Sequence, residues 1–253
     1  MIDKSRCVVV VPVYKKFEDY NDNEQRAFWQ TLHSFPGREV VIVCPDSLSS
    51  DYRSFSRIAL DKKYFSYSGY NLMCKSDWFY QLFLDLNFTY MCLVQLDVWI
   101  FQDNLEYFLN EFDKDQLDYI GAPWAGVWFA PDGTVGNGGF CIRRLEKFRD
   151  ICQNNSRGGG NEDTFFLQFF NKEGGIKTAP SRLAAEFSWE EKPYFWYRLM
   201  NSRLPMGCHA YASTPDRIGF WKNFISGIRE IKCKAGRVDI YNNPEFEKKF
   251  RNE

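Results

Sequence analysis

The chain contains the run Tyr90-Met-Cys-Leu-Val-Gln-Leu-Asp-Val-Trp-Ile-Phe101. Residues 90–96 are almost continuously apolar, which is typical of a strand buried on both faces of a parallel sheet. We expect this strand to end at Asp97, at the carboxyl edge of the sheet, where open α/β folds bind their ligands. A carboxylate in that place is suited to hold Mg²⁺ or Mn²⁺ against a diphosphate. A cap on the following turn explains the same aspartate equally well.

Outside this run, short β-branched stretches alternate with helical patterns, which predicts an α/β fold with a mixed, mostly parallel central sheet flanked by helices. The expected strands are 7–13, 39–44, 58–60, 90–96 and 119–122. The expected helices are 23–35, 49–58, 70–86, 105–112, 145–153, 162–171 and one that begins at Pro215. We expect one domain over 1–230, with a nucleotide-sugar-binding half (1–120), an acceptor and catalytic half (121–230), and then an exposed polar C-terminal tail (231–253).

The composition excludes several classes of protein. A formal net charge of −1 over 253 residues argues against a protein that coats nucleic acid. The two histidines, His33 and His209, are too few for a zinc site built from several imidazoles. The eight cysteines are dispersed without a CxxC pair, so we expect buried thiols in a reducing compartment. No apolar run is long enough for a transmembrane helix and no signal peptide is recognised, which favours a cytoplasmic protein and leaves peripheral attachment to a membrane open.

Common catalytic and nucleotide-binding motifs are absent from the sequence. No GxxxxGK[ST] occurs and no GxGxxG follows a strand, which argues against a P-loop protein and a dehydrogenase. The glycines at 158–160 fit a surface loop better than a phosphate cradle. Neither histidine is matched by a nucleophile-elbow serine, which argues against Ser-His-Asp hydrolysis.

Further candidates for chemistry lie in the second half of the chain. Glu162 and Asp163 follow the glycine loop and open a helix, where a carboxylate is well placed as a general base. Acidic residues are also common in a first helical turn because they favour the helix dipole. His209 lies in a stretch rich in Gly and Pro, and a lone histidine is more often structural. Together with Asp97, these residues would form a minimal site for metal-assisted transfer.

Two other segments suit a sugar ligand. Trp124 and Trp128 offer flat surfaces for a sugar face, with a place in the core as the alternative. In Gly136-Asn-Gly-Gly-Phe140 the backbone can approach a ligand closely and Asn137 can bond hydroxyls, with a tight turn as the alternative.

Taken in order, these segments resemble a GT-A-type glycosyltransferase, most closely a family catalogued as an uncharacterised GT-A-like domain. The resemblance extends over residues 8–221. It is carried by the segments 9–14, 69–73, 95–101, 118–124, 136–140, 162–165 and 205–209.

The resemblance implies a nucleotide-sugar donor, with UDP-sugars favoured, bound over the first half of the sheet. Asp97 matches the metal-binding acid of the DxD motif, but Trp99 stands in place of the second acid, so a Mn²⁺ or Mg²⁺ ion would rest on Asp97 and His209. The metal, or a cation such as Lys75, would stabilise the departing diphosphate. The implied donor-binding residues are Pro12, Val13, Tyr14, Lys75, Gln95 and Asp97, and the implied acceptor-binding residues are Trp124, Asn137, Gly138 and Gly139.

The resemblance also implies the catalytic residues Asp163 and Glu162. Asp163 matches the base of inverting members, which deprotonates an acceptor hydroxyl as that oxygen attacks the anomeric carbon. Retention of configuration stays open. The expected function is therefore a glycosyltransferase that acts on a glycan or glycoconjugate acceptor, in polysaccharide biosynthesis.

Two alternatives remain at this point. A sugar nucleotidyltransferase would use the same fold, but such enzymes place a glycine-rich, basic loop after the first strand, and residues 12–16 contain no glycine. A carbohydrate-binding protein without catalysis is favoured by the missing second acid and by the aromatic content of 18%. Affinity for a nucleotide-sugar separates the transferase from this binding protein.

Overall fold

The structure, a computed structural model, describes residues 6–155, 160–229 and 241–252. Its strands are β1 (Cys7–Pro12), β2 (Val40–Pro45), β3 (Arg57–Leu60), β4 (Tyr90–Val94), β5 (Val98–Ile100), β6 (Tyr119–Gly121), β7 (Phe140–Arg144), β8 (Ser188–Trp189) and β9 (Gly207–His209). Its α-helices are α1 (Asp22–Ser34), α2 (Tyr67–Cys74), α3 (Asp77–Leu84), α4 (Leu105–Asp115), α5 (Leu145–Asn154), α6 (Glu162–Leu167), α7 (Ser181–Phe187), α8 (Pro193–Leu199), α9 (Pro215–Trp221) and α10 (Pro244–Arg251). Short 3-10 helices are η2 (Phe17–Asp19), η3 (Asp46–Leu48) and η4 (Lys62–Phe65).

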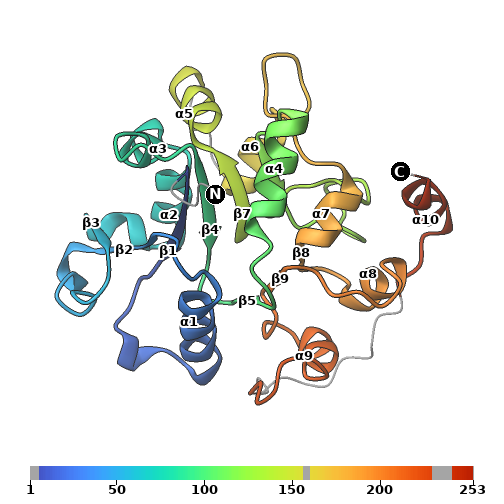
Figure 1. Cartoon of the computed structure of the whole chain (residues 1–253), viewed down its shortest axis with the longest axis horizontal. Helices are drawn as coiled ribbons and strands as arrows, with labels where there is room; N and C mark the ends of the chain where they lie inside the picture. Colours follow the sequence, from blue (N-terminus) through green and yellow to red (C-terminus); the bar gives the residue numbers. More distant parts are fainter. Residues whose placement is uncertain (1–5, 156–159, 230–240, 253) are drawn as a thin grey trace.

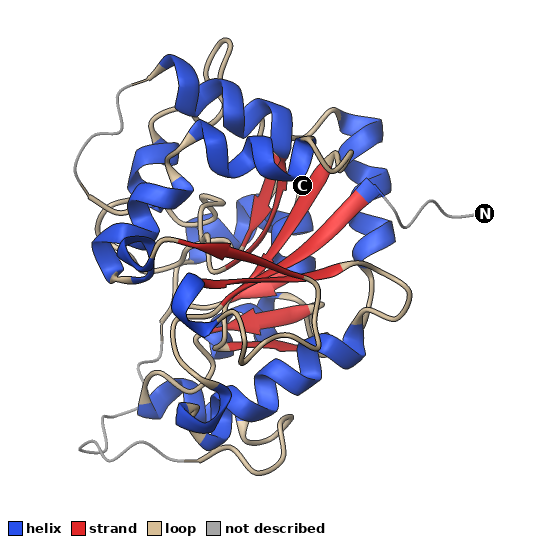
Figure 2. Ribbon diagram, turned by 90° about the vertical axis from the view of Figure 1, so that its left-hand side faces the viewer, coloured by secondary structure: helices blue, strands red, loops and turns tan. Residues whose placement is uncertain are grey.

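The larger sheet has six strands in the order β3-β2-β1-β4-β7-β6. Strands β3, β2, β1 and β4 run parallel, whereas β7 is antiparallel to both of its neighbours. Every residue of β1 and β4 is buried, as expected for apolar strands covered on both faces. Helices lie on both sides of the sheet (Figure 2). The predicted α/β fold with a mostly parallel central sheet flanked by helices is confirmed.

A second sheet brings the late part of the chain to the end of β4. It has three strands in the order β5-β9-β8. Strand β5 follows β4 after the turn at 95–97 and lies beside β9 (Figure 1). The two strands pair antiparallel, so that Val98 lies opposite His209. A second hydrophobic cluster, which includes Trp189, Trp196 and Trp221, packs around this sheet. Residues more than a hundred positions apart in the sequence therefore meet beside Asp97.

Most elements lie within a few residues of the predicted bounds, but the helix expected over 70–86 is broken into α2 and α3. Ser76 has an extended backbone, and its hydroxyl donates to the Leu72 carbonyl at 2.7 Å. The Tyr80 hydroxyl donates to the Cys74 carbonyl at 2.6 Å. In a continuous helix these two carbonyls would accept from backbone amides of the next turn. Here the two hydroxyls donate to them instead, which allows α2 to end at Cys74.

Two other predicted helices are wrong in whole or in part. Over 49–58 the chain forms successive turns closed by backbone bonds between residues three apart, such as the Asp51 amide to the Leu48 carbonyl at 3.0 Å, and then β3, which pairs with β2. The helix predicted over 162–171 ends at Leu167. Beyond it, Phe170 forms a β-bridge with Ile176 and Asn171 takes a left-handed backbone with φ of 54°.

The C-terminal segment is not the exposed tail that we expected, as far as it is described. Residues 231–240 lie outside the described residues. In the following stretch, Phe246 and Phe250 lie four residues apart on one face of α10 and are buried against Trp196. Burial of this apolar face attaches α10 to the second cluster. The division of the domain into two halves stays a prediction.

The cysteines are buried in the described part of the chain, and none of them forms a disulfide there. Cys233 and glycines 158 and 159 lie outside the described residues. Among the described helices, none combines the length and the apolar character needed to cross a membrane.

Candidate active site

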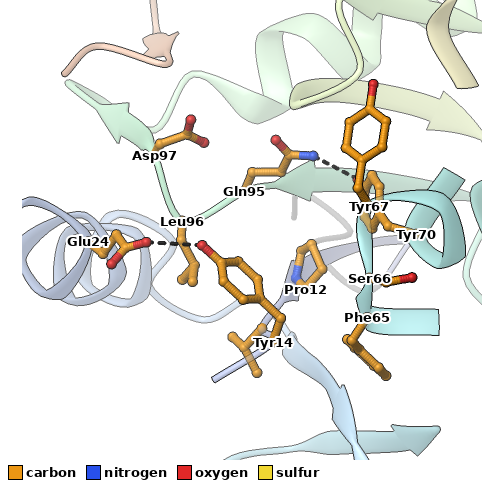
Figure 3. A pocket seen from close by; sticks show the side chains of 11 residues that line it. Pro12, Tyr14, Glu24, Phe65, Ser66, Tyr67, Tyr70, Gln95, Leu96 and Asp97 are labelled. Carbon is orange, nitrogen blue, oxygen red and sulfur yellow. Dashed lines mark hydrogen bonds between the residues drawn. The ribbon is translucent and has the colours of Figure 1, made fainter. Parts of the chain in front are cut away.

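A pocket of about 370 Å³ opens where β1 and β4 end (Figure 3). Its walls come from the turn after β1, the residues around the start of α2, and the turn between β4 and β5. It is lined by Pro12, Val13, Tyr14, Glu24, Phe65, Ser66, Tyr67, Tyr70, Gln95, Leu96 and Asp97. This is the carboxyl edge of the parallel strands, where the sequence predicts a ligand.

Aromatic rings and a few polar groups form the walls of this pocket. The Tyr14 hydroxyl donates to Glu24 Oε1 at 3.1 Å, and Gln95 Nε2 donates to the Tyr70 hydroxyl at 3.0 Å (Figure 3). The Tyr67 side chain is exposed, and its hydroxyl donates to Asn161 Oδ1. Because Asn161 is the residue before α6, this hydrogen bond connects the pocket to the helix that carries Asp163.

A second pocket of about 450 Å³ adjoins the first and shares Glu24, Leu96 and Asp97 with it. Its other lining residues come from the start of α1 and from the segments after β9: Asn21, Asp22, Asn23, Tyr211, Ala212, Ser213 and Arg229. Asp97 therefore borders both pockets, and its side chain is half exposed.

His209 lies between two carboxylates and the Gln95 amide. Its Nε2 atom is 3.3 Å from Asp97 Oδ1 and 3.1 Å from Gln95 Oε1. Its Nδ1 atom is 3.5 Å from Glu190 Oε2, an ion-pair distance. Asp97 and Gln95 thus face one ring nitrogen, while Glu190 faces the other.

The carboxylates change the protonation of the histidine. Burial lowers the pKa of His209 because it disfavours the charged imidazolium. The negative charges of Asp97 and Glu190 have the larger combined effect and hold the pKa of His209 well above its usual 6.5. Burial would raise the pKa of Asp97 and of Glu190, yet the facing imidazole holds both below their usual values. In the protein without a ligand, His209 is therefore stabilised as a cation between two anions.

Arg217 holds Glu190 in place from the other side. Its Nη1 atom is 3.4 Å from Glu190 Oε1 and donates to the Ser213 hydroxyl at 3.0 Å. Its Nη2 atom donates to Glu191. A buried guanidinium that binds two carboxylates and a hydroxyl restrains the segment that carries Glu190.

A second cluster of charges lies at the start of α6. Glu162 is buried and accepts from Arg143 Nη2 at 2.9 Å. Arg143 is itself buried and also donates to the Tyr80 hydroxyl at 2.8 Å. The Asn71 side chain accepts from the Glu162 amide at 2.6 Å, which fixes the first turn of α6. Asp163 follows Glu162 directly, and its Oδ1 atom is buried with no hydrogen-bond partner in the described part of the chain.

Gly138 and Gly139 lie between the two clusters. A Cβ atom at Gly138 would lie 2.2 Å from Glu162 Oε1 and 2.5 Å from Asp163 Oδ1, so these two oxygens are at most 4.7 Å apart. A Cβ atom at Gly139 would lie 2.2 Å from His209 Nε2. Only residues without a side chain let the carboxylates and the imidazole approach the backbone this closely. The pair of glycines therefore brings the two clusters into one site.

This arrangement alters the acidity of Asp163. Burial, and then the charge of Glu162, raise the pKa of Asp163 well above its usual 3.8, against the opposing effect of Arg143. The charges of Glu190 and His209 have smaller effects on this pKa, in opposite directions. A carboxylate with a raised pKa is a stronger base than an ordinary aspartate, which suits proton abstraction.

The structure brings most of the predicted site residues together. Pro12, Val13, Tyr14, Gln95 and Asp97 line the first pocket, and His209 joins them. Lys75 does not line that pocket; its Nζ donates to the Gly160 carbonyl at 2.9 Å, beneath the start of α6.

The predicted acceptor residues have mixed surroundings. Trp124 is only 4% exposed, so its ring faces are covered. Asn137 is also buried, and its Oδ1 accepts from the Gly139 amide at 3.1 Å, so its side chain stabilises the glycine turn. Gly138 and Gly139 lie against the charged groups described above.

Sequence reasoning missed Glu190, Arg217 and Arg143. Glu190 lies in an acidic pair with no recognisable motif, and its distance to His209 depends on the β8-β9 pairing. Arg143 is part of β7, where a charged residue among buried neighbours was the available signal. Trp99, the residue at the place where the resemblance implies a second acid, packs against Tyr211 with ring centroids 6.0 Å apart.

Comparison with known proteins gives a family match. A family model described as "Protein of unknown function (DUF5672)" matches residues 54–209. A search of curated proteins finds no match.

Several solved structures are similar to this chain. One is a glycosyltransferase involved in the glycosylation of the major capsid of PBCV-1, with 9% identity and a TM-score of 0.49, covering 84% of this chain and 95% of that one. Another is the mannosyltransferase Ktr4p from S. cerevisiae in complex with GDP, with 11% identity, a TM-score of 0.41, and coverage of 60% and 61%. A third is S. aureus TarS 1-349 in complex with UDP-GlcNAc, with 17% identity, a TM-score of 0.37, and coverage of 57% and 47%. Because the identities and TM-scores are low, these similarities carry no conclusion about the activity of this chain.

Proposed function

The chain belongs to the DUF5672 family, whose function is unknown, and we propose from its site that it is a glycosyltransferase. It would move a sugar from a nucleotide-sugar donor to a hydroxyl of a glycan or glycoconjugate acceptor. The observation that carries the proposal is the joint placement of three groups. Asp97, at the wall of an aromatic pocket, pairs with His209, and the base candidate Asp163 lies across the adjoining Gly138 and Gly139.

The first pocket suits the nucleoside part of the donor. Tyr14, Tyr67 and Tyr70 offer rings for a flat base, and Ser66 and Gln95 offer hydrogen-bonding groups. Asp97 lines both the first and the second pocket. Its carboxylate would therefore lie beside a ligand that extends from the first pocket into the second. A nucleoside diphosphate has this shape, with a flat end and a charged end, and UDP is the donor nucleotide that we favour.

The residues around His209 fit a divalent metal. Ligands about 2.1 Å from Mg²⁺ and at right angles to each other lie about 3 Å apart. The separations of His209 Nε2 from Asp97 Oδ1 (3.3 Å) and from Gln95 Oε1 (3.1 Å) are close to that value. Glu190 beside Nδ1 is the partner that a metal-binding histidine usually has, because it holds the ring with Nε2 toward the metal.

Asp97 and His209, with Gln95, would hold Mn²⁺ or Mg²⁺. In the described ranges, no three His, Cys, Asp or Glu side chains converge to hold a metal by themselves. The donor diphosphate would therefore have to supply further oxygen ligands. The metal, when bound, would neutralise charge on the leaving diphosphate.

Asp163 would act as the general base. As the acceptor oxygen forms a bond to the anomeric carbon, its proton would pass to the Asp163 carboxylate, and the bond from that carbon to the diphosphate oxygen would break. Attack opposite to the leaving group inverts the configuration. The lack of a partner for Asp163 Oδ1 among the described residues, and the charge of Glu162 beside it, support this role because both make the carboxylate more basic.

The test is Asp163→Asn, assayed for transfer with a panel of nucleotide-sugars and separately for nucleotide binding. A positioned base contributes about 10²–10⁴ in rate, so transfer should fall by that factor while the binding of UDP is retained. Full transfer activity in Asp163→Asn would remove the residue from this role.

Two alternatives make different predictions. A carbohydrate-binding protein without catalysis has no need of a nucleoside pocket and should not bind any nucleotide-sugar. A sugar nucleotidyltransferase should form a nucleotide-sugar from a nucleoside triphosphate and a sugar phosphate. Measurement of nucleotide-sugar binding, followed by product analysis, distinguishes all three.

A further inference from the structure

Tyr67 forms an exposed aromatic wall of the first pocket. It is the first residue of α2 and is 75% exposed, more than any other aromatic residue that lines this pocket. Figure 3 shows it on the α2 side of the pocket, with its hydroxyl pointing away from the other labelled residues. An exposed side chain exchanges between rotamers unless a contact restrains it. The contact that restrains this ring therefore decides whether it is fixed before a ligand binds.

That contact is a hydrogen bond from the Tyr67 hydroxyl to Asn161 Oδ1. Asn161 is the N-cap residue of α6, where an Asn side chain usually accepts from a backbone amide of the first helical turn. In the described ranges Asn161 makes no such cap bond. Its acceptor oxygen is directed to the pocket residue instead, so it restrains Tyr67 and does not cap α6.

Asn161 is anchored, because the residues on both sides of it are bonded to α2 and its C-cap. The Glu162 amide donates to Asn71 Oδ1 at 2.6 Å. On the other side, the Gly160 carbonyl accepts from Lys75 Nζ at 2.9 Å. Asn71 and Lys75 are both buried. Asn161 is therefore the fixed partner of the hydrogen bond, and the exposed ring is the restrained one.

The Asn71 side chain also holds the backbone of Tyr67. Its Nδ2 atom donates to the Tyr67 carbonyl at 2.8 Å, while its Oδ1 atom accepts from the Glu162 amide. One buried amide thus joins the backbone of the pocket residue to the backbone of α6. The hydrogen bond between the side chains of Tyr67 and Asn161 completes this connection, so the ring is held at both of its ends.

We propose that Asn161 is a positioning residue for the donor nucleotide, and that it holds the Tyr67 ring as a preformed wall for the base of a nucleoside diphosphate. The proposal deepens the proposed function and rests on it for the identity of the ligand. An aromatic ring stacks on any planar base, and a ring that is fixed beforehand loses no rotamer freedom when the ligand binds. In this assignment neither side chain contacts the reacting atoms, so the effect is on nucleotide affinity.

The experiment measures the Kd of UDP, GDP and dTDP by calorimetric titration of the full chain in the presence of Mn²⁺. Tyr67→Phe keeps the ring and removes the hydroxyl, Asn161→Ala removes the acceptor, and a double variant combines the two changes. Tyr67→Ala removes the ring as well.

The matched control is Tyr107→Phe. Tyr107 is 47% exposed, its hydroxyl donates to Glu186 Oε2 in α7 at 3.2 Å, and it lines neither pocket of the candidate site. This control removes a hydrogen bond of the same kind at a place remote from the proposed ligand. Thermal unfolding confirms that each variant is folded.

We expect the Kd of the nucleotide that the wild type binds to rise about 2–10-fold in Tyr67→Phe and in Asn161→Ala, because ordering one side chain on binding costs about this factor. The double variant should match the single ones, since all three lack the same hydrogen bond. Tyr67→Ala should weaken binding further, because the stacking surface is lost. Tyr107→Phe should leave the Kd unchanged.

Equal Kd values for the wild type and both single variants would overturn the proposal. Effects on binding free energy that add up in the double variant would also overturn it, because the two side chains would then act independently. Turnover with a nucleotide-sugar gives a further readout, in which the loss should appear in the donor KM and not in kcat. A lower kcat with an unchanged Kd would assign the hydrogen bond to the placement of Asp163 instead and would refute the proposal.

The outcomes separate this proposal from the proposed function. If the wild type binds none of these nucleotides, the glycosyltransferase and the role of Asn161 are both refuted. If a nucleotide binds with the expected order of variants but no sugar is transferred from any nucleotide-sugar, the transferase is refuted and the role of Asn161 stands. If transfer proceeds and every variant binds the nucleotide equally well, the transferase stands and the role of Asn161 is refuted.

Discussion

Substitution of Asp163 by Asn should stabilise the protein while it removes transfer. The Asp163 carboxylate is held near Glu162 Oε1, at no more than 4.7 Å between oxygens, and its Oδ1 has no hydrogen-bond partner among the described residues. An unsatisfied buried polar group costs about 1–3 kcal/mol. An Asn side chain removes the like charge and can donate to Glu162. The gain of about 1–3 kcal/mol corresponds to an increase in Tm of about 2–12 °C for a chain of this size.

The pH dependence of this gain has a definite sign. The pKa of Asp163 is raised in the folded protein, so its ionisation is less favourable there than in the unfolded chain. Any stability that this residue contributes is present below the usual aspartate pKa of 3.8 and is lost as pH rises through the raised value. The difference in Tm between Asp163→Asn and wild type should therefore be small in acid and grow toward neutral pH.

The neighbouring carboxylate is the matched control. Glu162 forms a buried ion pair with Arg143, with side chains 6% and 1% exposed. Removal of one partner of a buried pair costs about 3–5 kcal/mol, so Glu162→Gln should lower Tm by about 6 °C or more. Calorimetry of both variants between pH 4 and 8 measures the two effects. A lower Tm for Asp163→Asn at neutral pH, or an unchanged Tm for Glu162→Gln, would refute this account of the two acids.

Other predictions concern the histidine. Glu190→Gln should weaken Mn²⁺ binding about 10–100-fold in calorimetric titration, because the His209 ring loses the carboxylate that fixes its orientation. Glu191→Gln is the control and should leave Mn²⁺ affinity unchanged, since Glu191 pairs with Arg217. Equal effects of the two substitutions would contradict the role of Glu190. Gly139→Ala should displace the His209 ring, with which its Cβ would collide, and so reduce Mn²⁺ affinity in a folded protein; unchanged affinity would show that the ring is not a ligand. Mn²⁺ affinity should increase as pH rises toward the raised pKa of His209, since the metal replaces the ring proton, and a flat profile would argue against an imidazole ligand.

The sequence predicts the central sheet and the edge of the sheet at which the first pocket lies. The valines of β1 and the apolar run that becomes β4 are unambiguous because both faces of these strands are covered. β4 ends at Val94, two residues before the predicted end of the strand, and Asp97 lies in the turn that follows it at the predicted edge of the sheet. Pro12, Val13 and Tyr14 line the same pocket because β1 is parallel to β4 and ends at the same edge.

Features that depend on tertiary contacts could not be predicted in this way. The break between α2 and α3 depends on the Tyr80 hydroxyl, which reaches back to the Cys74 carbonyl. Glu190 reaches His209 because β8 and β9 pair in parallel, and no local pattern encodes this pairing. Trp124 is buried and Trp128 is exposed, although the sequence predicts the same sugar-facing surface for both rings, because nothing in their local sequence distinguishes them.

The most direct test of the central claim is a thermal-shift screen with UDP-, GDP-, CMP- and dTDP-sugars, each with and without Mn²⁺. A ligand at 100 times its Kd adds about 2.7 kcal/mol to stability, which is easily detected. The account predicts a shift with one nucleotide class that is larger with Mn²⁺ and that loses its Mn²⁺ dependence in Asp97→Ala. Absence of a shift with every nucleotide-sugar would contradict the glycosyltransferase.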